Sequence, residues 1–121
     1  MNQFALARAK VKNFRFKPNQ TELQLLEFFD ENFPGKIIFN GGQIIIEGMV
    51  GDFYCAKHYT FLEYVGRPDV PKHQPEALER RRLVFAKYGF RMMFIHQADL
   101  KDKELLCNNV LFFLHFGLAP A

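Results

Sequence analysis

The sequence predicts an α/β fold in a single domain, and three observations lead to this prediction. The chain has 121 residues, a length that suits one modest core. Hydrophobic residues make up 49% of it and include 15 phenylalanines, enough to fill such a core. Segments with helical spacing and short β-like segments follow one another as helix, several strands, helix, strand and helix. A mixed central sheet of about five strands, with helices on both faces, accounts for this order.

The chain divides into an N-terminal arm, residues 1–18, and a domain, residues 19–121. The arm is rich in basic residues and has no acidic residue. Its basic residues are Arg8, Lys10, Lys12, Arg15 and Lys17. Two interpretations stay open: a solvated N-terminus, or a basic arm that lies against phosphates. The net charge of +3 permits an anionic partner without requiring one.

The first predicted helix begins within "PNQTE". Asn19 is its expected cap, and Glu22 three residues later completes a capping box. The segment "FPG" ends this helix. The segments "KIIFN" and "QIIIEG" are predicted strands joined by a turn at residues 40–42, and "DFYCA" and "YTFLEYV" are the next two strands.

The second half of the domain continues with a proline-containing loop and a helix over "EALERRRLVFAKY" that ends at Gly89. The fifth predicted strand is "FRMMFIH", and the last helix lies within "ADLKDKELLCNNVLFFLHFG", with Asp99 or Asp102 as its cap. The strand, helix and strand over residues 59–95 suit a right-handed crossover with parallel pairing, whereas the earlier strands suit antiparallel pairing.

The most apolar stretch, "LLCNNVLFFLHFGLA", is too short and too interrupted to cross a bilayer. The first residues lack the apolar segment of a signal peptide. We therefore expect a cytoplasmic protein with no membrane partner. The last helix is more apolar on all sides than a surface helix, which either core packing or self-association as a homodimer explains.

Two acidic residues, Asp52 and Glu63, lie in strands that are otherwise apolar or aromatic. A hairpin centred on Lys57 and His58 pairs these acids directly on one face of the sheet, with Cβ atoms about 5 Å apart. Apolar residues on both faces make these strands central, where an acid is costly to bury without compensation. A divalent cation, a basic side chain and a shared proton are three ways to compensate the pair, and the spacing does not choose between them.

In their order and spacing, these segments resemble the PD-(D/E)xK superfamily of nucleases, in particular its very short mismatch-repair-like and restriction-like members. The resemblance covers about residues 19–100. It rests on "NQTELQLL", "GDFYC", "FLEYVG", "ERRRLVFAKYGFR" and "FIHQADL". It implies a restriction endonuclease-like core in αβββαβα order. It also implies Mg²⁺- or Mn²⁺-dependent hydrolysis of phosphodiester bonds in DNA, selective for branched, mismatched or nicked structures, with RNA as an open alternative.

The resemblance assigns roles to residues of this chain. Asp52 and Glu63 are the implied metal ligands, helped by the backbone carbonyl of Tyr64. Glu22 is implied to hold a second metal or to position a water molecule, although a capping box explains its position equally well. These residues form the expected catalytic site together with Arg81.

Two positions depart from the family pattern. Gly51 stands where the family has a proline, and Val65 stands where it has a lysine that touches the attacking water or the phosphate. We expect Arg81 to replace this lysine, because a helix packed across the sheet can aim one basic side chain at the strand ends. Other basic groups are further candidates: Arg82, Lys57, His58 and His73.

Basic side chains outside the acidic site are expected to bind nucleic acid. They are Lys10, Lys12, Arg15, Lys17, Lys57 and Arg82. Arg80, Arg81 and Arg82 follow one another at about 100° per helical residue, so they cannot all face solvent, and one points inward or toward a ligand.

Three hypotheses for the function stay open. The first is the nuclease. The second is a nuclease-fold module that binds nucleic acid or a partner protein without cutting, which the replacement of the lysine by Val65 motivates. The third is an assembly protein that self-associates through its last helix and neutralises the acid pair with an internal arginine. The chain is thus expected to act as a homodimer or as a subunit of a DNA-processing complex.

Overall fold

The structure, a computed structural model, describes residues 18–67 and 69–117. Its elements are α2 (Gln20–Asn32), β1 (Ile38–Phe39), β2 (Phe53–Cys55), β3 (Thr60–Val65), α3 (Pro75–Lys87), β4 (Arg91–His96) and α4 (Lys103–Phe116). Three short 3₁₀ turns connect them: η2 (Ala56–His58), η3 (Pro71–His73) and η4 (Gln97–Lys101). The arm residues Lys10, Lys12, Arg15 and Lys17 lie outside the described residues.

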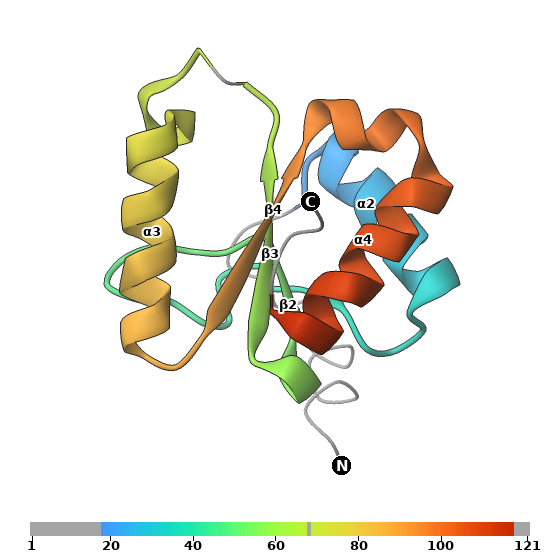
Figure 1. Ribbon diagram of the computed structural model, residues 1–121, viewed down its shortest axis with the longest axis horizontal. Helices are drawn as coiled ribbons and strands as arrows, with labels where there is room; N and C mark the ends of the chain where they lie inside the picture. Colours follow the sequence, from blue (N-terminus) through green and yellow to red (C-terminus); the bar gives the residue numbers. More distant parts are fainter. Residues whose placement is uncertain (1–17, 68, 118–121) are drawn as a thin grey trace.

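The described elements form an α/β fold in three layers. Helix α3 covers one face of the central sheet, and α2 and α4 cover the other (Figure 1). The strand order is β1-β2-β3-β4, with antiparallel pairing of β1 with β2 and of β2 with β3. Strands β3 and β4 are parallel, which confirms the crossover predicted through the second helix. The sheet has four strands rather than the five predicted.

The hairpin of β2 and β3 has the predicted register. Phe53 pairs with Leu62 and Cys55 pairs with Thr60 around a four-residue loop, Ala56–Tyr59. The same register, continued by one residue beyond β2, places Asp52 opposite Glu63. The prediction succeeded because a turn centre fixes every pair in an antiparallel hairpin.

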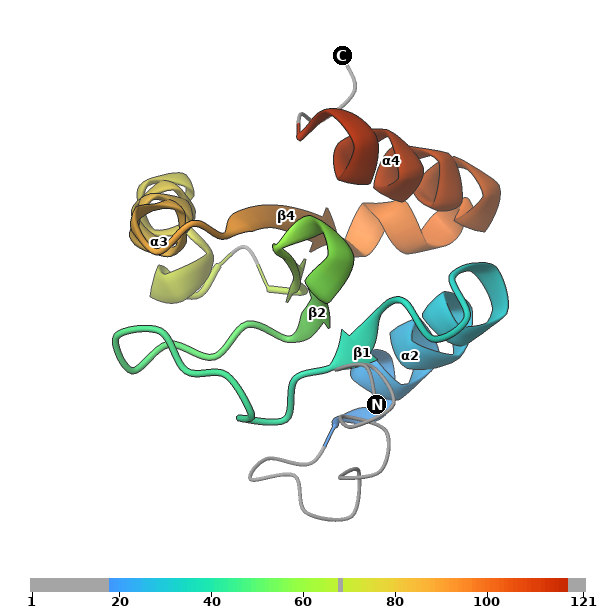
Figure 2. The ribbon, with the colours of Figure 1, turned by 90° about the horizontal axis from the view of Figure 1, so that it is seen from below.

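The predicted strand "QIIIEG" is wrong, because residues 40–52 form a loop. Its strand-like pairing is one isolated bridge between Ile46 and Met49. Glu47 and Gly48 both have positive φ, 48° and 78°, and form the tight turn that this bridge closes. Figure 2 shows the loop, between β1 and β2, extending to the side of the sheet that α3 covers.

The side chain of Asn40 organises this loop in place of a strand pairing. It is 1% exposed. Its Nδ2 donates to the carbonyls of Ile44 and Gly51, both at 2.9 Å, and its Oδ1 accepts from the Ile44 amide at 2.8 Å. Because the Asn40 side chain forms hydrogen bonds with these backbone groups, they do not need a neighbouring strand as a partner.

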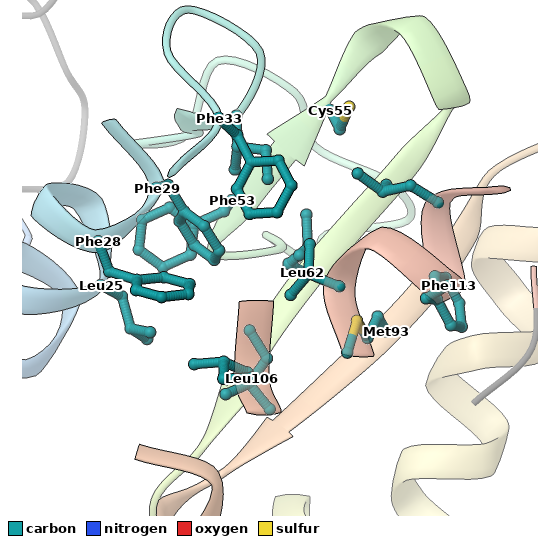
Figure 3. Close-up of a cluster of buried hydrophobic side chains, with 14 of the residues drawn as sticks. Leu25, Phe28, Phe29, Phe33, Phe53, Cys55, Leu62, Met93, Leu106 and Phe113 are labelled. Carbon is teal, nitrogen blue, oxygen red and sulfur yellow. The ribbon is translucent and has the colours of Figure 1, made fainter. Parts of the chain in front are cut away.

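Two apolar clusters hold the layers together, and alternate residues of the strands divide between them. Phe53 and Leu62 face the cluster under α2 and α4, where Phe29 packs edge-on against Phe53 (Figure 3). Phe61 faces the other cluster and packs edge-on against Phe85 of α3 at 5.0 Å. The central strands are therefore covered on both faces, as predicted.

The helix ends follow the capping signals of the sequence. Asn19 and Glu22 form the predicted capping box of α2, with hydrogen bonds of 2.8 and 2.9 Å. Asp102 caps α4 through the Leu105 amide at 3.0 Å. Among the described residues, no helix combines the length and apolar character needed to cross a membrane.

Candidate functional site

Three carboxyl groups from different elements meet in one cleft. Asp52 directly precedes β2, Glu63 lies within β3, and Glu22 lies in the first turn of α2. The cleft has a volume of about 390 Å³ and is also lined by Asn19, Tyr64, Gly66, Arg67, Val70, Lys72 and His73. A second hollow of about 130 Å³ shares Asp52 and Glu63 with it and extends to Arg81.

The Asp52 carboxylate is held by the strand opposite it. Its Oδ2 accepts a hydrogen bond from the Tyr64 amide at 2.8 Å. In a β-strand, the N–H and C=O of one residue point to the same edge, so the Tyr64 carbonyl faces the edge at which Asp52 lies. The side chains of Glu22 and Glu63 both interact with the Asp52 carboxyl. The structure thus brings together the predicted residues Glu22, Asp52, Glu63 and Tyr64.

Arg81 forms an ion pair with the most buried acid of the site. Its Nε lies 2.6 Å from Oε2 of Glu63, which is 8% exposed, and its Nη2 donates to the Val50 carbonyl at 2.7 Å. The guanidinium also lies over the Phe85 ring, 5.5 Å from its centroid. One arginine of the run does face inward, as predicted, and it is Arg81.

The other two arginines of the run face solvent. Arg80 is exposed, and Arg82 forms a bidentate surface ion pair with Glu79 in the same helix. The inward direction of Arg81 follows from the period of the helix, which places it four residues before the fully buried Phe85.

Burial and mutual repulsion raise the pKa values of the acids. The pKa of Asp52 rises from its ordinary 3.8 to about 7, mainly through burial and then through the charge of Glu63. Burial raises the pKa of Glu22 from 4.5 to about 7, with a further contribution from Asp52. Burial also raises the pKa of Glu63, and the charge of Arg81 opposes this. With all three acids ionised, Arg81 offsets one negative charge and leaves two.

Lys72 is a basic residue of the site that the sequence reasoning missed. It lies in η3, is exposed, and lines both hollows. Its positive charge lowers the pKa values of Glu22 and Glu63 as a secondary influence. His73, a predicted candidate, also lines both hollows, with its Nδ1 2.8 Å from the Arg67 carbonyl oxygen. One signal was available: the loop that contains Lys72 directly follows β3 and must pass its end.

Lys57 and His58 lie in the turn at the opposite end of the hairpin from the acids. The extended chain from Asp52 to Cys55 alone covers about 10 Å, and the turn lies beyond it, so neither residue takes the place of the lysine that the resemblance leads us to expect at the acid pair. Val65 occupies that position in β3, on the same face as Glu63, and is 3% exposed. Strand β3, Thr60–Val65, therefore presents no basic side chain at the acid pair.

Packing explains the glycine at position 51, where the resemblance leads us to expect a proline. A Cβ atom at this position would lie 2.5 Å from Cδ1 of Phe61, well inside van der Waals contact. The ring of Phe61 is fully buried between Tyr54, Phe85 and Phe90. The residue before Asp52 must therefore lack a side chain in this fold.

The donors at this site fit a magnesium-like cation in their chemistry. Two carboxylates and a backbone carbonyl are hard oxygen donors, the type that Mg²⁺ and Mn²⁺ prefer, with water completing the coordination. In the described part of the chain, no three Asp, Glu, His or Cys side chains form a group able to hold one metal ion. A cation here would depend on Asp52, Glu63 and the Tyr64 carbonyl, and one oxygen of Glu63 is already engaged by Arg81.

Comparisons with known proteins identify no relative of this chain. No family model matches the chain, and no curated protein or solved structure matches it either.

Proposed function

We propose that this protein is a metal-dependent nuclease that hydrolyses phosphodiester bonds of DNA. The observation that carries the proposal is the meeting of Asp52 and Glu63 in a cleft where Arg81 offsets a single negative charge. Together with Glu22, the fully ionised site retains two negative charges that no ion pair offsets, and the exposed Lys72 acts on them only as a secondary influence. Such a site favours a divalent cation, whose charge is equal and opposite.

In this proposal, Asp52, Glu63 and the Tyr64 carbonyl hold Mg²⁺ or Mn²⁺. The cation lowers the pKa of a water molecule and offsets the charge that develops on the phosphate. The Tyr64 amide fixes the direction of the Asp52 carboxylate. Arg81 holds Glu63 in place through Oε2 alone, which leaves Oε1 to the cation in this proposal.

Glu22 supplies a second role at the edge of the cleft. Its pKa of about 7 gives it comparable amounts of the protonated and ionised forms near neutral pH. A carboxylate with this pKa is well suited to take a proton from an attacking water molecule. Its hydrogen bond with the Asn19 amide anchors it to the start of α2 and limits its motion.

The proposed substrate is DNA with a structural irregularity: a branch, a mismatch or a nick. The described domain offers little surface for reading a long base sequence, so we expect it to recognise the shape of the DNA rather than its sequence. We infer that a second subunit, or a larger DNA-processing complex, supplies the remaining contacts with the DNA.

The test is cleavage of a labelled panel of DNA structures in Mg²⁺ or Mn²⁺. We expect Asp52→Ala and Glu63→Ala to abolish cleavage, because each removes a metal ligand. Asp69→Ala is the matched control, since this acid is exposed and pairs with Arg67 at the surface. Cleavage that persists unchanged in both site variants would reveal a contaminating nuclease and refute the proposal.

A second candidate function is a nuclease-fold module that binds nucleic acid or a partner without cutting. Two observations favour it: the ion pair of Arg81 with Glu63, and the buried Val65 in place of a lysine. Calorimetry separates the two functions. Salt-dependent DNA binding with no heat of Mg²⁺ or Mn²⁺ binding would favour the binding module.

A further inference from the structure

We propose that Lys72 is the catalytic residue that contacts the substrate phosphate, an inference that rests on the proposed nuclease function. Lys72 lines both the 390 Å³ cleft and the 130 Å³ hollow, and these two spaces share Asp52 and Glu63. A phosphate that lies across the acid pair therefore lies against Lys72. Its ammonium group then stabilises the negative charge that develops on the phosphate oxygens.

The other cations of the site are already engaged. Arg81 is held by Glu63 and by the Val50 carbonyl. Arg67 pairs with Asp69 at 3.1 Å, and its side chain is 72% exposed. Within residues 18–67 and 69–117, Lys72 forms no hydrogen bond or ion pair. It is the lysine beside the acids that has its full donor capacity left for a ligand.

Strand β3 itself provides no such cation. Val65 shares the face of Glu63, and its 3% exposure leaves it in the packed interior rather than in the cleft. The loop after β3 returns past the strand end instead. It is shaped by hydrogen bonds from the His73 amide to the Val70 carbonyl at 3.0 Å and from the Gln74 amide to the Pro71 carbonyl at 3.3 Å. Lys72 therefore combines an ordered backbone with a long flexible side chain.

The experiment compares Lys72→Ala and Lys72→Arg with Lys36→Ala. Lys36 is also an exposed lysine, and its charge acts on Cys55 and His58 at the end of the hairpin away from the acids, so it controls for the loss of one positive charge. For Lys72→Ala we expect cleavage about 100-fold slower, the effect typical of losing one donor to a transition-state charge. We expect Lys72→Arg to recover part of the loss and Lys36→Ala to stay within about 2-fold.

Two further readouts separate contact with phosphate from a structural role. In Lys72→Ala, affinity for Mn²⁺ should not fall, because the lost positive charge repelled the cation, and the urea midpoint of unfolding should not change. Affinity for a 5′-phosphorylated dithymidine in Ca²⁺, measured by competition with a fluorescent oligonucleotide, should fall by about 10-fold.

Each outcome decides a separate point. If wild-type protein cleaves DNA and Lys72→Ala cleaves and binds equally well, the role of Lys72 is refuted and the nuclease stands. If wild-type protein does not cleave but binds the dinucleotide in a Lys72-dependent manner, the phosphate contact stands and the nuclease is refuted. If wild-type protein neither cleaves DNA nor binds the dinucleotide, both are refuted.

Discussion

Replacing Asp52 by asparagine removes a carboxyl group that the fold holds in an unfavourable environment. The pKa of this group is about 7 in the folded protein, and its ordinary value of 3.8 applies to the unfolded chain. Between about pH 4 and about pH 7 the folded chain therefore binds more protons than the unfolded chain, and the free energy of unfolding falls as the pH rises through this range. Asparagine does not ionise, and its Oδ1 still accepts the hydrogen bond from the Tyr64 amide.

The magnitude follows from the size of this pKa difference. About three pKa units correspond to roughly 4 kcal/mol, which is the upper limit of the effect. Asp52 is partly exposed and shares its titration with Glu22 and Glu63, so its own contribution is smaller. We therefore expect Asp52→Asn to be more stable than the wild type by about 1–2 kcal/mol at pH 8 without metal, and about equally stable at pH 4.

Urea unfolding in EDTA at the two pH values measures this difference. Asp69→Asn is the control, because this exposed acid in a surface ion pair should change stability by less than about 0.5 kcal/mol at either pH. If Asp52→Asn destabilises the protein equally at both pH values, the carboxyl group is not held in its neutral form by the fold. The electrostatic reasoning about the site would then be wrong.

Three further substitutions test packing around the site through the free energy of unfolding. Arg81→Met leaves Glu63 buried beside an apolar side chain and should cost about 3 kcal/mol at neutral pH, with a smaller loss at acid pH. Gly51→Ala forces a Cβ atom against the Phe61 ring and should cost about 1–3 kcal/mol. Asn40→Ala removes three hydrogen bonds from the buried loop and should cost about 2–3 kcal/mol.

For each of these substitutions, one result would contradict the predicted loss of stability. An Arg81→Met protein as stable as the wild type at neutral pH would show that Glu63 does not depend on the guanidinium. A neutral effect of Gly51→Ala would show that the Phe61 ring has room to move. A mild effect of Asn40→Ala would show that water replaces the side chain in the loop.

The sequence predicted the hairpin well because its information is local. The four-residue turn between β2 and β3 fixes the register, and the register alone places Asp52 opposite Glu63. The capping box of α2 is likewise contained in four consecutive residues. Burial on both faces also followed from the sequence, since apolar residues occupy both sets of alternate positions.

The loop of residues 40–52 was mispredicted because its conformation depends on a long-range contact. Three consecutive isoleucines have strong β propensity, yet the Asn40 side chain bonds Gly51, eleven residues away, and satisfies the backbone locally. Lys72 was missed for a related reason. Its position beside the acids is set by the return path of the loop after β3, which neither periodicity nor spacing encodes.

The direction of Arg81 could be predicted from helical periodicity, whereas its partner could not. The choice between a cation, a proton and a basic side chain for the acid pair needed the three-dimensional arrangement. The structure combines the basic side chain with the proton. Arg81 pairs with Glu63, and the raised pKa values of Asp52 and Glu22 favour the protonated forms of these two acids.

Manganese titration by calorimetry, in two buffers of different ionisation enthalpy near pH 6.5, tests the central claim most directly. We predict one bound ion per chain with release of about one proton, because the cation displaces a proton held by Asp52 or Glu22. Asp52→Ala should abolish the binding heat, and Asp69→Ala should preserve it. Binding that survives in Asp52→Ala, or no binding to the wild-type protein, would contradict a metal site at this acid pair.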